Sequence, residues 1–203
     1  MRSITNVYTI TATDDDGICL SQTPGGAGGL TINGALLGGI PTAQHVTIAC
    51  AGADAARTFT ITGLGSNGQT KTEAVAGVNT ATATSTKNFS IVTSVVVDAA
   101  TAGAIKVGYV QTAELVWIPL NHYAIGVNYG WMVTIGVATY SIEGTHSNIQ
   151  DSTVTALPFT ITPAATATAA GYSTVPCRAI RVNLTSWTSG TVTVQFTQAD
   201  GTS

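Results

Sequence analysis

The sequence predicts an all-β protein, built as two β-sandwich domains of the Ig-like or jelly-roll-like kind, with very little helix. In residues 58–62 threonines alternate with Phe59 and Ile61, so an extended chain places apolar side chains on one face and hydroxyl groups on the other. A glycine-rich segment follows at residues 63–68, and a second polar-faced segment returns through residue 75, which predicts a β-hairpin. No stretch carries an apolar stripe at helical spacing over three turns. Because a lone hairpin is marginal in water, it must pair with further strands.

The same alternation predicts more strands in the first half of the chain. The first lies at residues 4–12, where the apolar side chains change phase once at Val7 and Tyr8, so a bulge or an edge strand is expected. Residues 74–87 are rich in Thr and Ala and only weakly patterned. The other predicted strands of this half are residues 30–34, 44–51, 89–97 and 104–110.

Two loops of this half resemble ligand sites at first sight. Residues 13–17, T-D-D-D-G, hold three adjacent carboxylates, but a strong Ca²⁺ loop spaces its acidic ligands at alternate positions and adds a distal glutamate, so a turn is predicted. Residues 24–29, P-G-G-A-G-G, have the glycine density of a phosphate loop. They lack the G-K-[ST] ending and precede a strand rather than a helix, so nucleotide binding is rejected.

The composition shifts toward aromatic residues after residue 112, and we place a domain boundary there, between an N-terminal β-sandwich domain at 1–112 and a C-terminal one at 113–203. In residues 131–142 the apolar parity changes once, which predicts a bulge near Ala138 and Thr139. A short strand is expected at 157–162, ending at Pro163, followed by an irregular connection or a flat, weak strand at 164–170. Residues 180–184 and 192–196 alternate on either side of S-W-T-S-G, which predicts a closing hairpin.

Charge is scarce along the whole chain. Asp, Glu, Lys and Arg make up 8% of the 203 residues, against roughly 25% in ordinary soluble domains. Such a hydroxyl-rich surface suits a subunit of a large assembly, and also suits a stable extracellular-type β protein with a threonine-rich coat. The seven basic residues are scattered, so no nucleic-acid partner is expected.

Neither a secretory signal nor a membrane span is predicted. Met1 and Arg2 are followed by polar, alternating sequence rather than by an apolar core. Residues 115–142 carry no formal charge, but a proline, asparagines, glycines and strand-like alternation argue against a spanning helix. The three cysteines, Cys19, Cys50 and Cys177, lack C-x-x-C spacing. One disulfide is possible among them, but we expect buried reduced thiols.

A catalytic constellation is not visible. His45, His122 and His146 lie outside any nucleophile or metal motif, and the small group of Glu143, His146 and Asp151 falls in E-G-T-H-S-N-I-Q-D, which is interpreted as a polar loop. We therefore predict no enzyme activity, no catalytic residue, no cofactor and no metal.

The tryptophans are the residues most open to a binding role. Trp117, Trp131 and Trp187 all follow residue 112 and could contact a partner at an interface or stack on a glycan. The alternative is that they are core anchors, given the area that an indole buries.

Several stretches resemble a family of tailed-bacteriophage virion proteins. The matching stretches are T-I-N-G-A-L (31–36), H-V-T-I-A-C-A-G-A-D-A-A-R-T-F-T-I-T-G (45–63), F-S-I-V-T-S-V-V-V (89–97), A-T-A-G-A-I-K-V-G (100–108), W-I-P-L-N (117–121) and W-M-V-T-I-G-V-A-T-Y-S-I-E-G-T (131–145). The resemblance implies a virion protein made in the host cytoplasm, and we expect a capsid decoration or cement protein. Its partners would be the major capsid protein or other virion proteins, and it would form a homo-oligomer. The alternative is a receptor- or glycan-binding module of a tail or fibre.

Overall fold

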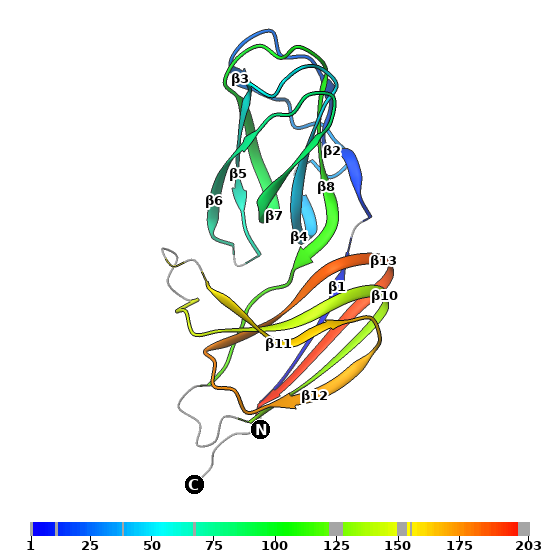
Figure 1. Ribbon diagram of the computed structural model, residues 1–203, viewed down its shortest axis with the longest axis vertical. Helices are drawn as coiled ribbons and strands as arrows, with labels where there is room; N and C mark the ends of the chain where they lie inside the picture. Colours follow the sequence, from blue (N-terminus) through cyan, green and yellow to red (C-terminus); the bar gives the residue numbers. More distant parts are fainter. Residues whose placement is uncertain are drawn as a thin grey trace. The chain divides into compact units, whose positions relative to one another are not determined.

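The computed structural model describes residues 2–10, 12–37, 39–66, 68–121, 128–149, 154 and 156–198. Thirteen strands and no helix are found among these residues, so the all-β prediction is confirmed (Figure 1). No helix in this part of the chain has the length and apolar character that crossing a membrane requires.

The chain forms two compact units whose division differs from the one we predicted. The central unit is Thr11–Ala113, and the terminal unit joins Met1–Ile10 to Glu114–Ser203. The division after Ala113 lies next to the boundary that we predicted, whereas the first strand belongs with the second part of the chain. The reason is long-range pairing: β1 (Arg2–Thr9) runs antiparallel to the end of β13 (Ala179–Gln198), with Arg2 opposite Gln198 and Thr9 opposite Thr191.

The central unit is an antiparallel arrangement with the strand order β8-β4-β7-β5-β6. β7 pairs with β4 mainly through its first half and with β5 through its second half. It therefore joins the β8-β4 side of this order to the β5-β6 side. β2 pairs with β8, and the two-residue β3 pairs with β7. The strands of this unit are β2 (Asp14–Gln22), β3 (Gly28–Gly29), β4 (Gly39–Cys50), β5 (Thr58–Leu64), β6 (Thr70–Ala76), β7 (Thr82–Val97) and β8 (Ile105–Glu114).

The core of the central unit lies where the alternation placed it. The predicted hairpin is confirmed as β5 and β6, with Phe59 opposite Val75, and both Phe59 and Ile61 are fully buried. Cys19 and Cys50 belong to the same core. They flank β8 on strands two steps apart, about 9.5 Å, which is too far for a disulfide. All three cysteines are free and buried, as predicted, and burial raises the pKa of the Cys19 thiol to about 11.

Two local predictions for the central unit were wrong. Residues 14–17 are the start of β2 rather than a turn, and Asp14 pairs with Tyr109 of β8. Residues 30–34 form no strand. The weakly patterned residues 74–87, for which we predicted no element, include the first part of β7, whose sixteen residues begin at Thr82.

The terminal unit is organised around two long strands, β10 (Tyr129–Thr145) and β13, which pair along almost their whole lengths. Both strands bend, so the first half of β10 and the second half of β13 lie in one layer and the remaining halves in another (Figure 1). β12 (Ala169–Ser173) and β1 complete the first layer, while β11 (Pro158–Ala165) and β9 (Ile118–Pro119) complete the second. The unit is thus a sandwich made from a folded ribbon.

The bend occurs at two glycines. Gly190 has a φ of +87°, and a Cβ atom on Gly136 would collide with the backbone oxygen of Ser189. The register of β10 with β13 shifts between Ile135 and Val137 and again before Tyr140, which confirms the predicted bulge. The predicted closing hairpin was wrong, because residues 186–190 continue β13 through the bend instead of reversing the chain.

The core of the terminal unit lies between these layers. Val194 and Phe196 come from one layer, and Ile142 and Val182 from the other, and all four are nearly or fully buried. Two predictions about its edge were incomplete, since β11 continues past Pro163 to Ala165 and residues 169–173 form β12.

Candidate functional site: an uncharged sheet face

The two histidines that the structure describes, His45 and His146, lie in different surroundings. The His146 ring stacks on Phe159 with a centroid separation of 5.0 Å. His45 lies on β4, and its Nδ1 atom is buried. His122 and Asp151 lie outside the described residues.

Glu143 belongs to a buried ion pair and not to a loop. β10 extends to Thr145, so the polar-loop prediction for Glu143 was wrong. The Glu143 carboxylate accepts a hydrogen bond of 2.8 Å from Arg181 Nε and one of 2.9 Å from Asn183 Nδ2. The Arg181 guanidinium lies 4.4 Å from the ring centre of Trp117, a cation–π contact. These contacts hold a cross-strand pair of β10 and β13 together, since Glu143 and Arg181 are register partners.

The three aspartates at the start of β2 bring their carboxylate oxygens within 4.8 Å of one another. Lys106 on β8 neutralises part of this charge, with Nζ 3.0 Å from Asp15 and 3.7 Å from Asp16. The aspartates raise the pKa of Lys106, chiefly through the hydrogen bond that its ammonium donates to the Asp15 carboxylate. The cluster is therefore a surface ion-pair network that joins two strands.

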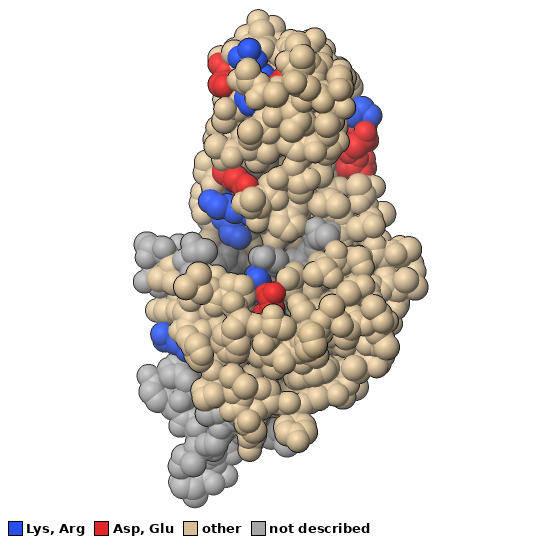
Figure 2. Space-filling view, viewed as in Figure 1, with Lys and Arg blue, Asp and Glu red and all other residues tan. Residues whose placement is uncertain are grey.

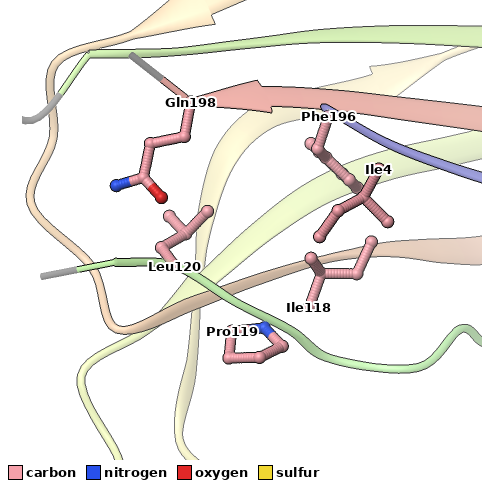
Figure 3. A pocket seen from close by; sticks show the side chains of 6 residues that line it. All are labelled: Ile4, Ile118, Pro119, Leu120, Phe196 and Gln198. Carbon is pink, nitrogen blue, oxygen red and sulfur yellow. The ribbon is translucent and has the colours of Figure 1, made fainter. Parts of the chain in front are cut away.

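Two hollows in the described surface are small or shallow. A groove of about 250 Å³ on the central unit is lined mainly by small side chains and by the Asp15–Lys106 pair, and it is below the usual volume of ligand pockets, about 300–1,000 Å³. In the terminal unit, Ile4, Ile118, Leu120 and Phe196 point toward one another around a cavity of about 10 Å³, with Gln198 beside it (Figure 3). That space holds about one water molecule at most, so it is a packing feature.

Each tryptophan already has partners within the chain. Trp131 is 8% exposed and belongs to the core, and its indole lies against Gly171 on the neighbouring strand. Trp187 is half-buried and donates a 2.8 Å hydrogen bond from Nε1 to the Gly190 carbonyl. Trp117 is half-buried against Arg181. The prediction that Trp117 and Trp187 contact a partner or a glycan stays a prediction, whereas Trp131 has little surface to offer.

The feature that stands out is one face of the layer formed by β12, β10, β13 and β1. The strand registers place its outward side chains in rows: Ser3, Thr197, Gly130 and Tyr172 in one, Thr5, Gln195, Met132 and Ala170 in the next, Val7, Thr193 and Thr134 in the third, and Thr9 with Thr191 in the last. We call this set of residues the neutral face. Gln195 Nε2 lies 3.3 Å from Thr5 Oγ1, which agrees with their position side by side.

The neutral face contains no ionisable group other than the Tyr172 phenol. Six of its thirteen residues are threonines. Three larger apolar or aromatic side chains lie among them, with exposures of 83% for Tyr172, 64% for Val7 and 40% for Met132. Charged side chains are also sparse on the side of the molecule that Figure 2 shows. The face can therefore be covered by a partner without leaving a buried charge unpaired.

Sequence reasoning did not find this face. The phase break at Val7 was its one local signal, and we interpreted it as a bulge or edge strand. β1 has no bulge but is an edge strand, which agrees with the second of these alternatives, and Val7 points outward. Tyr172 and Met132 could not be assigned to the face, because their alignment depends on the pairing of β12 with β10.

Comparisons with known proteins give no match: neither the family models, nor the curated proteins, nor the solved structures contain one.

Proposed function

We propose that the protein is a structural component of a bacteriophage virion, and specifically a capsid decoration protein that bridges and stabilises subunits of the shell. The observation that carries this proposal is the neutral face, on which three exposed apolar or aromatic side chains lie among hydroxyl groups with no Lys, Arg, Asp or Glu beside them. The resemblance of residues 31–145 to tailed-bacteriophage virion proteins supports the same assignment.

In this role the protein would act by reinforcing the shell rather than by catalysing a reaction. A decoration protein adds buried area between neighbouring shell subunits and thereby opposes the outward pressure of the packaged genome. Covering Tyr172, Met132 and Val7 removes apolar surface from water, at about 25 cal/mol per Å². Threonine hydroxyls can keep hydrogen-bond partners, direct or through water, across such a contact. The occupant of the face is thus the major capsid protein.

Co-sedimentation with capsid shells stripped of this protein tests the proposal. We expect saturable binding at a fixed stoichiometry, and at least tenfold weaker binding by the Met132→Lys variant, because the lysine must be desolvated in the contact. Val96→Lys is the matched control, since Val96 is exposed to 41% on the central unit and Met132 to 40% on the neutral face. Absence of saturable binding, or equal weakening by both variants, would contradict the proposal.

The alternative is a receptor- or glycan-binding module of a tail or fibre. The exposed Tyr172 ring favours this glycan-binding alternative, since a flat aromatic ring flanked by hydroxyl groups can stack on a sugar. Intact host cells are therefore sedimented with the protein in parallel. Binding to cells alone, lost in a Tyr172→Ala variant that folds normally, would favour this alternative over decoration.

A further inference from the structure

β1 has one satisfied edge and one open edge. Its eight residues pair with β13 in an unbroken register from Arg2 to Thr9. No other strand among the described residues pairs with β1. In an antiparallel edge strand, alternate residues direct their backbone N–H and C=O groups outward, so the open edge offers a template for another strand.

The other edge strands of the described structure carry features that discourage such pairing. On β6, Glu73 accepts hydrogen bonds from the Thr86 and Lys87 amides, and the Lys87 ammonium donates to the Thr72 carbonyl, so side chains of β7 and β6 cover that edge. β2 begins with its three aspartates and has an irregular register. β9 and β11 contain prolines, and β12 has five residues only. These are the usual means by which proteins keep sheet edges from associating.

β1 has none of these features beyond its first residue. From Ser3 to Ile10 it contains no charge and no proline, and its register has no bulge. Val7, 64% exposed, is the type of side chain that a protected edge replaces with lysine.

We propose that β1 pairs with β1 of a second copy of this chain, antiparallel and about a twofold axis, to form a homodimer with one continuous sheet. Like strands meet in such a contact, so a charge near the centre of β1 would lie opposite or diagonal to its own copy. The uncharged stretch Ser3–Tyr8 avoids this repulsion, although the chain has a net charge of -3. An antiparallel pair is also self-complementary, as an isologous interface requires.

The register follows from keeping the two neutral faces on the same side. With a twofold axis perpendicular to the sheet at Asn6, Ile4 pairs with Tyr8 of the second copy and Thr5 with Val7. The contact then extends the neutral face of one copy into that of the other. This homodimer goes beyond the proposed function, because the pairing of two β1 strands needs no capsid shell and does not depend on whether the protein decorates one.

Sedimentation velocity of the purified full chain over a hundredfold concentration range tests the dimer. We expect a monomer–dimer equilibrium, and at least a tenfold increase in the dissociation constant for Val7→Lys. Thr134→Lys is the matched control, since Thr134 is exposed on the same face but lies on the inner strand β10. A wild-type chain that stays monomeric throughout, or equal weakening by both variants, would overturn the proposal.

Cysteine pairing tests the register independently of affinity. Mixing Thr5→Cys with Val7→Cys places the two thiols directly opposite each other, with Cβ atoms about 4.5–5.5 Å apart, whereas each variant alone sets its thiols on a diagonal at about 7–8 Å. We expect the mixture to form disulfide dimers faster than either variant alone on a non-reducing gel. The native cysteines are buried and give a low background. Faster cross-linking by Thr134→Cys than by the mixture would instead show that two copies contact each other through the neutral face, and it would contradict the proposed pairing of β1 with β1.

Discussion

Glu143 and Arg181 form the ion pair with the strongest energetic consequence among the described residues, because their side chains are only 11% and 8% exposed. Changing Glu143 to Gln leaves a buried guanidinium without its counter-charge, which costs about 3–5 kcal/mol of unfolding free energy in comparable pairs. We expect the lower end of that range, since the amide oxygen can keep one hydrogen bond to Arg181.

Urea unfolding monitored by tryptophan fluorescence measures this loss of stability in the terminal unit, because Trp117, Trp131 and Trp187 all lie there. Asp15→Asn is the control, since it removes one carboxylate from an exposed ion pair in the central unit and should leave the transition in place. An unchanged midpoint for Glu143→Gln would show that the pair contributes nothing.

At this scale the sequence predicted the burial of Phe59 and Ile61 and the absence of disulfides, since alternation and cysteine spacing are local properties. It did not predict the partners of Glu143. The segment after Tyr140 is polar enough to form a loop, and only pairing with Arg181 and Asn183 across the sheet makes it a buried strand end.

Among the elements, β13 depends on one residue for its bend. A β-branched side chain at Gly190, whose φ is +87°, is strained by about 1–3 kcal/mol. We expect Gly190→Val to lower the stability of the terminal unit by that amount and to shift the emission of Trp187, whose Nε1 donates to the Gly190 carbonyl. The measurement is thermal unfolding followed by fluorescence.

Gly26→Val serves as the control, because a Cβ atom there meets no atom within 4 Å. Equal stability of both variants would mean that the bend does not need a glycine. The same residue explains why a hairpin was predicted here: S-W-T-S-G carries turn-forming residues, and nothing local distinguishes a reversal of the chain from a bend within one strand. The partner strand β10 decides it, since it bends at the same place through Gly136.

For the whole molecule, the insertion of the central unit between β1 and the rest of the terminal unit predicts local responses to mutation. Ile4 contacts the terminal core beside Phe196 and Ile118 (Figure 3). We expect Ile4→Ala to accelerate amide hydrogen exchange in residues 192–198, because it loosens β1 on β13, and to leave exchange in β4 unchanged. Mass spectrometry of peptides from both units measures this.

Val95→Ala is the reciprocal variant, since Val95 is fully buried in the core of the central unit. Equal loss of protection in both units for either variant would show that they unfold as one. Sequence patterns placed the boundary near residue 113 but could not assign β1, because alternation within a strand says nothing about a partner some 190 residues away, as Thr5 and Gln195 are.

The pairing of β1 with β13 also sets an order on biosynthesis. The ribosome makes β1 long before β13, and the segment of β13 that pairs with β1 is complete only after about 190 further residues. At about 5–20 residues per second, the nascent chain carries this uncharged strand unpaired for roughly 10–40 s. The central unit can fold during that interval, so β1 joins its sheet only after the strands of the central unit have been made.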